Sequence, residues 1–295
     1  MTFALGAPLG ACVDPPFPNG GSVRGGGGGF GGSSSSDGGI SNSDGGDGGA
    51  GDAGVLPGVL FSRVASGTGD GAAVAVAVDG SGAAVVLGSF RGTLDFGGAA
   101  PTAGSNGSAF LARYDATGKL GWLKTFPASA ADALSLTALA VTTTGDVVIA
   151  GGCAGTVDLG GGALAGGADS DVCVARYDSA GKHRLSRRLG DNAAQSARAV
   201  ALDDAGAIFL GGALAGTMTI DGTTLRSAGQ KDAFLVKLDS TGKLVFGRSA
   251  GDGSDQEVQA LRPDGEGGVV AAGSFVGSIT QIGRASCRER VSSPV

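Results

Sequence analysis

The chain has a single histidine, His183, and aromatic residues make up only 5% of its 295 residues. One histidine excludes a metal site with several imidazole ligands, and it leaves Ser-His-Asp or Cys-His chemistry only one possible base. No apolar run in the sequence reaches the roughly 18–20 residues of a membrane-spanning helix. Charged residues are also scarce, at 16%, and the net charge is −6 with no basic stripe. We therefore expect no nucleic-acid partner, no metal and no cofactor.

Glycine is abundant instead, with 60 residues. Each glycine inside a helix costs about 1 kcal/mol relative to alanine, so helices are disfavoured throughout the chain. The apolar residues are mainly Ala, Val and Leu, which suit closely spaced sheets. The composition predicts an all-β protein.

A repeat with a constant period runs through the chain from about residue 58. The same pair, Gly followed by Thr or Ser, recurs every 61 to 63 residues, at Gly92, Gly155, Gly216 and Gly277. A constant period of this kind indicates a repeat architecture, and its length suits a unit of four strands.

Four short segments recur within each unit, and we expect each to be a strand. The first strands are Ala73–Asp79, Leu136–Thr142, Ala197–Asp203 and Glu257–Pro263, and they carry mainly Ala, Val and Leu. The second strands are Ala83–Phe90, Asp146–Cys153, Ala207–Leu214 and Gly268–Phe275. The third strands are Ala109–Asp115, Val172–Asp178 and Ala233–Asp239, and the fourth are Lys119–Phe126, Lys182–Leu189 and Lys243–Ala250. The second strands are almost entirely apolar, whereas the third and fourth alternate with Arg and Lys.

The turns between these strands repeat as well. Asp-x-x-Gly occurs at 79–82, 115–118, 178–181, 203–206, 239–242 and 264–267, and Thr142–Gly145 occupies the remaining slot. Asp at the first and Gly at the fourth position fit a type I turn with a left-handed glycine. A calcium loop is the alternative, but each turn offers one or two carboxylates and lacks the D-x-D-x-D-G spacing.

Three further motifs connect the units to a known family. They are Gly92-Thr93-Leu94-Asp95-Phe96, Gly118-Lys119-Leu120-Gly121-Trp122, and the segment Asp232–Asp239 with the sequence DAFLVKLD. In these motifs the chain resembles the bacterial β-propeller repeat often called SBBP. The resemblance implies a propeller with blades near 65–126, 127–189, 190–250 and 251–280. It also implies an exported or surface protein, and it says almost nothing about activity.

Counting the strands predicts an incomplete propeller of about three and a half four-stranded blades over residues 58–280. Val59–Val64 aligns with the fourth strands, so the chain begins on a strand that would complete the last blade of a ring. Closed propellers have about 4–8 blades. We expect the ring to be unclosed and this chain to be part of a larger propeller.

The two ends of the sequence differ from the repeats. Residues 1–12 end in Leu9-Gly10-Ala11-Cys12, which resembles a bacterial lipobox, so we expect a truncated lipoprotein signal with lipidation at Cys12. Residues 13–57 are rich in Gly, Ser and Asp and predict a disordered tether. Ile282–Val291 (IGRASCRERV) resembles a translated sequencing adapter, so we expect 281–295 to be an assembly artefact.

Two cysteines remain, Cys153 and Cys173, and both stand where the other units have Phe or Leu. The end of a second strand lies opposite the start of a third strand, so the two cysteines are expected to be neighbours. In an exported protein this predicts a disulfide. Two reduced, buried cysteines are the alternative.

These observations favour a non-enzymatic scaffold of the cell envelope, lipid-anchored to the outer membrane or cell surface. Such a scaffold would present loops to an unknown protein or glycan and would meet the membrane only through its N-terminal lipid. A propeller hydrolase or lyase with a site in the central channel is one alternative. A truncated fragment without independent function is another. His183 is expected at the solvated surface and Trp122 in the packing of an outer strand.

Overall fold

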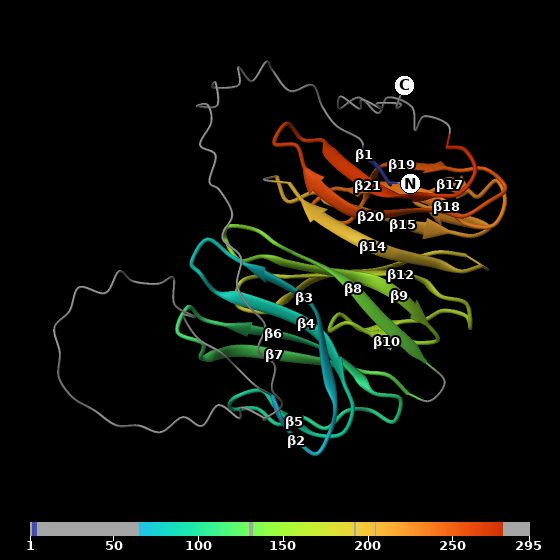
Figure 1. The fold of residues 1–295 in the computed structure, drawn as a ribbon. Helices are drawn as coiled ribbons and strands as arrows, with labels where there is room; N and C mark the ends of the chain where they lie inside the picture. The colour runs from blue at the N-terminus through green and yellow to red at the C-terminus, as the bar shows by residue number, and fades with distance from the viewer. Residues whose placement is uncertain (1, 5–64, 130–131, 192, 204, 280–295) are drawn as a thin grey trace, which may run out of the picture. The chain divides into compact units, whose positions relative to one another are not determined.

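All regular structure in the described part of the computed structural model is β-strand (Figure 1). The described residues are 2–4, 65–129, 132–191, 193–203 and 205–279. Three of the predictions fall outside these ranges, and the structure does not test them: those for Cys12, for Val59–Val64 and for residues 281–295. The described residues contain no helix that is long and apolar enough to cross a membrane.

Three four-stranded antiparallel sheets account for most of the strands. Sheet 1 consists of β3 (Gly71–Val78), β4 (Ala84–Phe90), β6 (Ser108–Tyr114) and β7 (Leu120–Pro127). Sheet 2 consists of β8 (Ala133–Val141), β9 (Val147–Ala154), β12 (Asp171–Tyr177) and β13 (His183–Leu189). Sheet 3 consists of β14 (Gln195–Leu202), β15 (Ile208–Leu214), β18 (Asp232–Leu238) and β19 (Leu244–Ala250). The predicted order of four strands in each of these units is confirmed.

A smaller sheet 4 follows, in which β20 (Gln256–Pro263) pairs with β21 (Val269–Phe275). The other edge of β21 pairs with β1 (Thr2–Ala4). Three short ribbons complete the described strands. In the first, β2 (Ser66–Gly67), which precedes β3, pairs with β5 (Leu94–Asp95) in the connection from β4 to β6. The other two lie within the equivalent connections of sheets 2 and 3: β10 (Val157–Asp158) with β11 (Ala163–Leu164), and β16 (Thr217–Ile220) with β17 (Thr223–Arg226).

The sheets pack face against face in chain order, and the first strand of each lies beside the first strand of the next. Val85 and Leu87 of sheet 1 share a core with Val147 and Ile149 of sheet 2. A second core joins sheets 2 and 3, and a third, smaller one joins sheets 3 and 4. The small side chains predicted from the composition allow these close contacts.

The Asp-x-x-Gly turns adopt the predicted geometry. In the six turns that start at residues 79, 115, 142, 178, 203 and 239, the glycine N–H donates to the carbonyl of the first residue, as Gly82 does to Asp79 at 3.1 Å. The glycines have positive φ, from 77° at Gly181 to 89° at Gly145. This left-handed conformation strains any residue with a Cβ, which explains the glycine at the fourth position.

Candidate ligand-binding face

The first strand of every sheet contains a β-bulge at the same place. Pairing with the second strand skips one residue in each sheet, and these residues are Val74, Thr137, Arg198 and Gln259. A bulge leaves its extra residue outside the ladder and redirects its side chain. Since the four first strands are neighbours, the bulges bring four side chains from distant parts of the sequence into one row.

Polar contacts connect this row across the sheets. Arg198 Nε donates to Glu257 Oε1 at 2.8 Å, which joins the first strands of sheets 3 and 4. The Thr137 hydroxyl donates to the carbonyl of Ala197 at 2.8 Å, which joins sheets 2 and 3. Sequence reasoning described these strands as Ala, Val and Leu, and it therefore missed Arg198 and Glu257. An alignment of the repeats contains the signal for this site, because charged Arg198 stands where sheet 1 has the apolar Val74.

Two cavities open at the end of the sheets where the first strands begin. One has a volume of about 280 Å³ and is lined by Ser196, Arg198, Lys231, Gln256, Glu257 and Ser274, among others. The other, about 470 Å³, lies between sheets 1 and 2 and is lined by residues that include Asp70, Arg91, Asn106 and Ser135. The first cavity is the better candidate site, because it combines the Arg198–Glu257 pair with a lysine and several hydroxyl and amide groups.

Buried acids lie at the start of the third strands, close to these cavities. Asp171 is buried and pairs with Arg188, whose Nε is 2.5 Å from Oδ2. Burial raises the pKa of Asp171, and the hydrogen bond and charge of Arg188 offset only part of this effect. Asp232, at the same position in sheet 3, is 3% exposed and accepts a hydrogen bond from the Ala228 N–H at 3.1 Å. Burial likewise raises the pKa of Asp232.

Each buried acid faces a buried glutamine from the next sheet. Gln195 Nε2 donates to the carbonyls of Ala215 and Thr217, both at 3.0 Å, which fixes the orientation of its amide. Its Oε1 and the Oδ1 of Asp171 both lie against Gly190, and neither accepts a hydrogen bond. Any Cβ at Gly190 would overlap these two oxygens. The glycine is therefore required by the acid–amide pair beside it.

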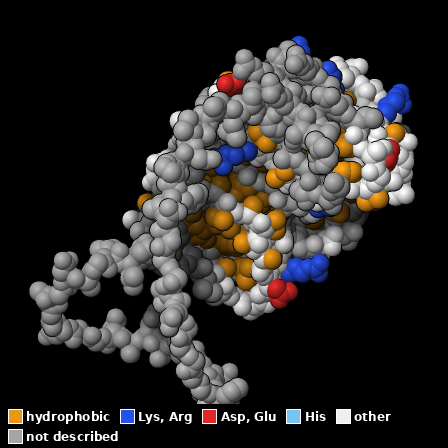
Figure 2. Space-filling view, turned by 45° about the horizontal axis from the view of Figure 1, so that its top comes forward, with side chains coloured by type: hydrophobic (Ala, Val, Ile, Leu, Met, Phe, Trp, Pro, Cys, Tyr) orange, Lys and Arg blue, Asp and Glu red, His pale blue; other side chains and the backbone are white. Residues whose placement is uncertain are grey.

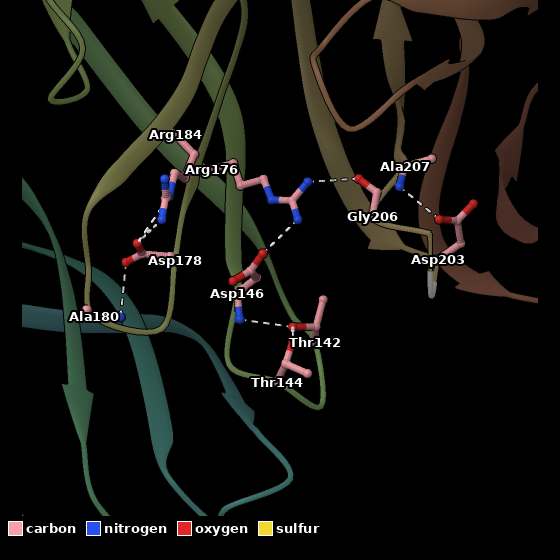
Figure 3. Close-up of polar contacts among 10 residues, drawn as sticks. All are labelled: Thr142, Thr144, Asp146, Arg176, Asp178, Ala180, Arg184, Asp203, Gly206 and Ala207. Atoms are coloured by element: carbon pink, nitrogen blue, oxygen red, sulfur yellow. Dashed lines mark hydrogen bonds and ion pairs between the residues drawn. The ribbon is translucent and has the colours of Figure 1, made fainter.

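The opposite end of the sheets carries a repeated cationic contact, and Figure 3 shows the instance at Arg176. Arg176 on β12 donates to Asp146 Oδ2 at 2.6 Å and to the carbonyl of Gly206, in the turn of sheet 3, at 3.0 Å. Lys237 on β18 repeats this contact: it lies 3.2 Å from Asp203 and donates to the Gly267 carbonyl at 2.7 Å.

The acidic partner of the cation is the first residue of the turn in sheets 1 and 3, but not in sheet 2. In sheet 1, Arg113 pairs with the buried carboxylate of Asp79. In sheet 2 the turn begins with Thr142, which has no carboxylate, and Asp146 four residues later supplies the anion for Arg176 instead. In sheets 2 and 3, the cation on the third strand thus joins its own sheet to the turn of the following sheet. In sheet 1, Arg113 pairs with the turn of its own sheet.

The turn carboxylates are used by the turns themselves. Asp115 Oδ1 accepts from the N–H groups of Thr117 and Lys119 at 2.9 and 3.0 Å, and Asp239 and Asp264 make the equivalent contacts. Over the described ranges, no three His, Cys, Asp or Glu side chains form a group that could hold a metal ion. The geometry fits structural turns rather than calcium loops.

Cys153 and Cys173 are joined by a disulfide in the structure, with Cα atoms 5.8 Å apart. They are diagonal rather than direct neighbours, since Cys153 lies opposite Asp171 and Cys173 opposite Gly151. Both are fully buried in the core between sheets 1 and 2.

The two remaining candidates differ in their surroundings. His183 packs edge-on against Tyr177 with ring centroids 5.9 Å apart, and its Nε2 atom is buried without a hydrogen bond. The expectation of a solvated surface histidine is therefore wrong. Trp122 packs as expected, and its Nε1 donates to the Ser179 carbonyl of sheet 2 at 3.0 Å.

No protein-family model matches the chain, and a search of curated proteins found no match either.

Proposed function

We propose that this chain is part of a β-propeller that serves as a non-enzymatic scaffold of the cell envelope and presents loops to a protein or glycan. The propeller is supported by three four-stranded sheets of identical strand order that pack face against face. In a propeller the first strand of each blade lines the central channel. The neighbouring positions of β3, β8, β14 and β20 agree with that arrangement.

The cavity of about 280 Å³ beside Arg198 is the observation that carries the binding function. Its walls combine charges of both signs with serine hydroxyls and the glutamine side chain of Gln256. These groups both donate and accept hydrogen bonds, as recognition of a hydroxyl-rich glycan or a polar loop requires. Phe275 adds an aromatic surface to the same cavity. The set lacks a nucleophile paired with a general base, so we propose binding without catalysis.

Binding to an array of purified glycans tests this proposal directly. We expect Arg198→Ala and Lys231→Ala to reduce binding at least tenfold, because both side chains line the cavity. Arg184→Ala is the matched control, since Arg184 is exposed on sheet 2 and pairs with Asp178 outside the cavity. Equal binding by all variants would contradict the proposed site, and release of glycan fragments would favour the hydrolase or lyase instead.

Export and lipid anchoring at Cys12 complete the proposal. They are supported by the lipobox-like Leu9–Cys12, by the tether-like composition that follows, and by a disulfide of the kind that persists in oxidising compartments. Expression in a bacterial host with a complete signal sequence should place the protein in the membrane fraction. Cys12→Ser should move it to the soluble fraction, whereas unchanged fractionation would argue against the anchor.

A further inference from the structure

Among the described residues, no four-stranded sheet packs against one face of sheet 1. Each sheet presents a forward face to the next sheet and a backward face to the one before it. The backward face of sheet 1 is formed by Val76, Ala84, Val86, Phe110, Ala112 and Tyr114. Most of these residues line an open cavity of about 490 Å³. Hydrophobic side chains also gather at the surface of the described part in Figure 2.

The register of the strands shows what kind of surface covers such a face. The backward face of sheet 3 has Val200, Ile208, Leu210, Phe234, Val236 and Leu238 at the same six positions. All six are buried in one core with Val148, Ala150, Val172 and Val174 of the forward face of sheet 2, and with Met218 and Ile220 of β16. Val200 is 8% exposed, whereas Val76 at the equivalent position is 68% exposed. On sheet 1, Phe110, Ala112 and Tyr114 are also buried, because they pack with Leu94 and Phe96 of the β4–β6 connection. The inner half of the face, with Val76, Ala84 and Val86, is the part that a covering sheet would bury.

The other end of the same stack carries the matching surface. The forward face of sheet 4 contains Ala260, Val270 and Ala272, which occupy the register positions of Ala138, Val148 and Ala150 in sheet 2. Ala260 is exposed, and Val270 and Ala272 are half-buried. One chain therefore presents both halves of the junction that sheets 2 and 3 form within it.

We propose that the forward face of sheet 4 docks on the backward face of sheet 1 of a second copy of this chain. The contact continues the stack of sheets from one molecule into the next. Because the two surfaces differ, the interface is heterologous, and repeated docking gives rings or longer arrays. This inference does not depend on the ligand-binding function proposed above.

Arg262 adds a charge that fits this contact. At the internal junctions, Arg176 and Lys237 reach a turn carbonyl of the following sheet. The described residues include no cationic third strand in sheet 4, but its first strand has Arg262 where the other first strands have Ala77, Ala140 and Ala201. Arg262 is exposed and lies on the forward face, near the turn that begins at Asp264. It is placed to make the equivalent contact with a second copy.

Sedimentation of the full chain over a hundredfold range of concentration tests the proposal. We expect mass above that of one chain to increase with concentration. Val76→Asp blocks one surface and Ala260→Asp the other, and both positions are exposed, so the fold should survive. Each variant alone should sediment as a monomer. An equimolar mixture should form dimers and nothing larger, because one intact surface remains on each partner.

Val245→Asp is the matched control, because Val245 is 57% exposed on β19 outside both faces. It should assemble like the unchanged chain. Arg262→Ala should weaken assembly about tenfold, while its melting temperature as a dilute monomer stays the same. An unchanged chain that is monomeric at every concentration overturns the proposal. Dimers of Ala260→Asp alone would also overturn it, because they would mean that sheet 1 pairs with itself.

Discussion

Arg176 donates a 3.0 Å hydrogen bond to the carbonyl of Gly206, thirty residues away in the turn of the next sheet. The same guanidinium pairs with Asp146 in its own sheet at 2.6 Å (Figure 3). One side chain thus joins two sheets, and Arg187 of sheet 2 adds a second polar link at this end, since it donates to the Gly242 carbonyl of sheet 3 and pairs with Asp221. If the sheets separated, Arg176 would keep its pair with Asp146 and lose its hydrogen bond to the Gly206 carbonyl.

Arg176→Ala should lower the free energy of unfolding by about 2–4 kcal/mol, because it leaves the Gly206 carbonyl and Asp146 without their partner. Chemical denaturation followed by circular dichroism gives this value. The control is Arg184→Ala, whose exposed pair with Asp178 should contribute about 0–1 kcal/mol. Equal effects of the two substitutions would mean that the contact between sheets adds no stability.

Asp79 should make the stability of sheet 1 sensitive to acid. Burial opposes its ionisation, but hydrogen bonds from Ser81, Arg113 and Ala83 outweigh this and lower its pKa from 3.8 to about 2. A carboxylate with a lowered pKa stabilises the fold above the unfolded value, and this contribution is lost as the pH falls from about 4 to 2. Asp79→Asn should cost about 1–3 kcal/mol at pH 7 and little at pH 2. An equal cost at both pH values, measured by urea denaturation, would contradict this.

Asp171 and Asp232 should respond oppositely to replacement by asparagine. Asp171→Asn should destabilise the protein by about 2–3 kcal/mol, because Arg188 loses its buried partner. Asp232→Asn should stabilise it on the order of 1 kcal/mol at pH 7. Oδ1 of Asp232 and Oε1 of Gln256 both lie against Gly251, and an asparagine N–H there could donate to the glutamine oxygen.

The effect at Asp232 should also depend on pH. Burial raises the pKa of Asp232, so its charged form destabilises the fold once the pH exceeds the unfolded value near 4. The gain from Asp232→Asn should therefore be present at pH 7 and should disappear below about pH 4. Thermal melts of both variants at the two pH values are the measurement. A loss of stability at Asp232→Asn at pH 7 would show that the carboxylate has a favourable partner.

The Cys153–Cys173 disulfide closes a loop with a sequence separation of 20 residues. Cross-linking a loop of this length stabilises the folded protein by roughly 3 kcal/mol, mainly because it restricts the unfolded chain. A chain with both Cys153→Ala and Cys173→Ala should melt several degrees lower than the oxidised protein. Dithiothreitol should lower the melting temperature of the unchanged chain by a similar amount and leave the double variant unaffected. If the reductant has no effect on the unchanged chain, the bond does not stabilise the fold.

The sequence by itself determined the strands and turns, because both depend on local chemistry. Asp-x-x-Gly places a carboxylate beside turn N–H groups and a glycine where φ is positive, so Asp79–Gly82 folds as its sequence predicts. The period of 61 to 63 residues then assigns each segment to its place in a sheet. The neighbouring positions of Cys153 and Cys173 followed from the same alignment.

Tertiary structure alone decided which polar residues meet. Arg198 and Glu257 are 59 residues apart, and only the bulge in β14 and the packing of β14 beside β20 bring them together. The different surroundings of Asp171 and Asp232 depend on whether the adjacent fourth strand supplies an arginine, as Arg188 does in sheet 2. Likewise, Val76 and Val200 have the same place in the repeat, and only the presence of a covering sheet decides which valine is buried. Burial and pairing depend on what packs against a residue, and the local sequence does not contain that information.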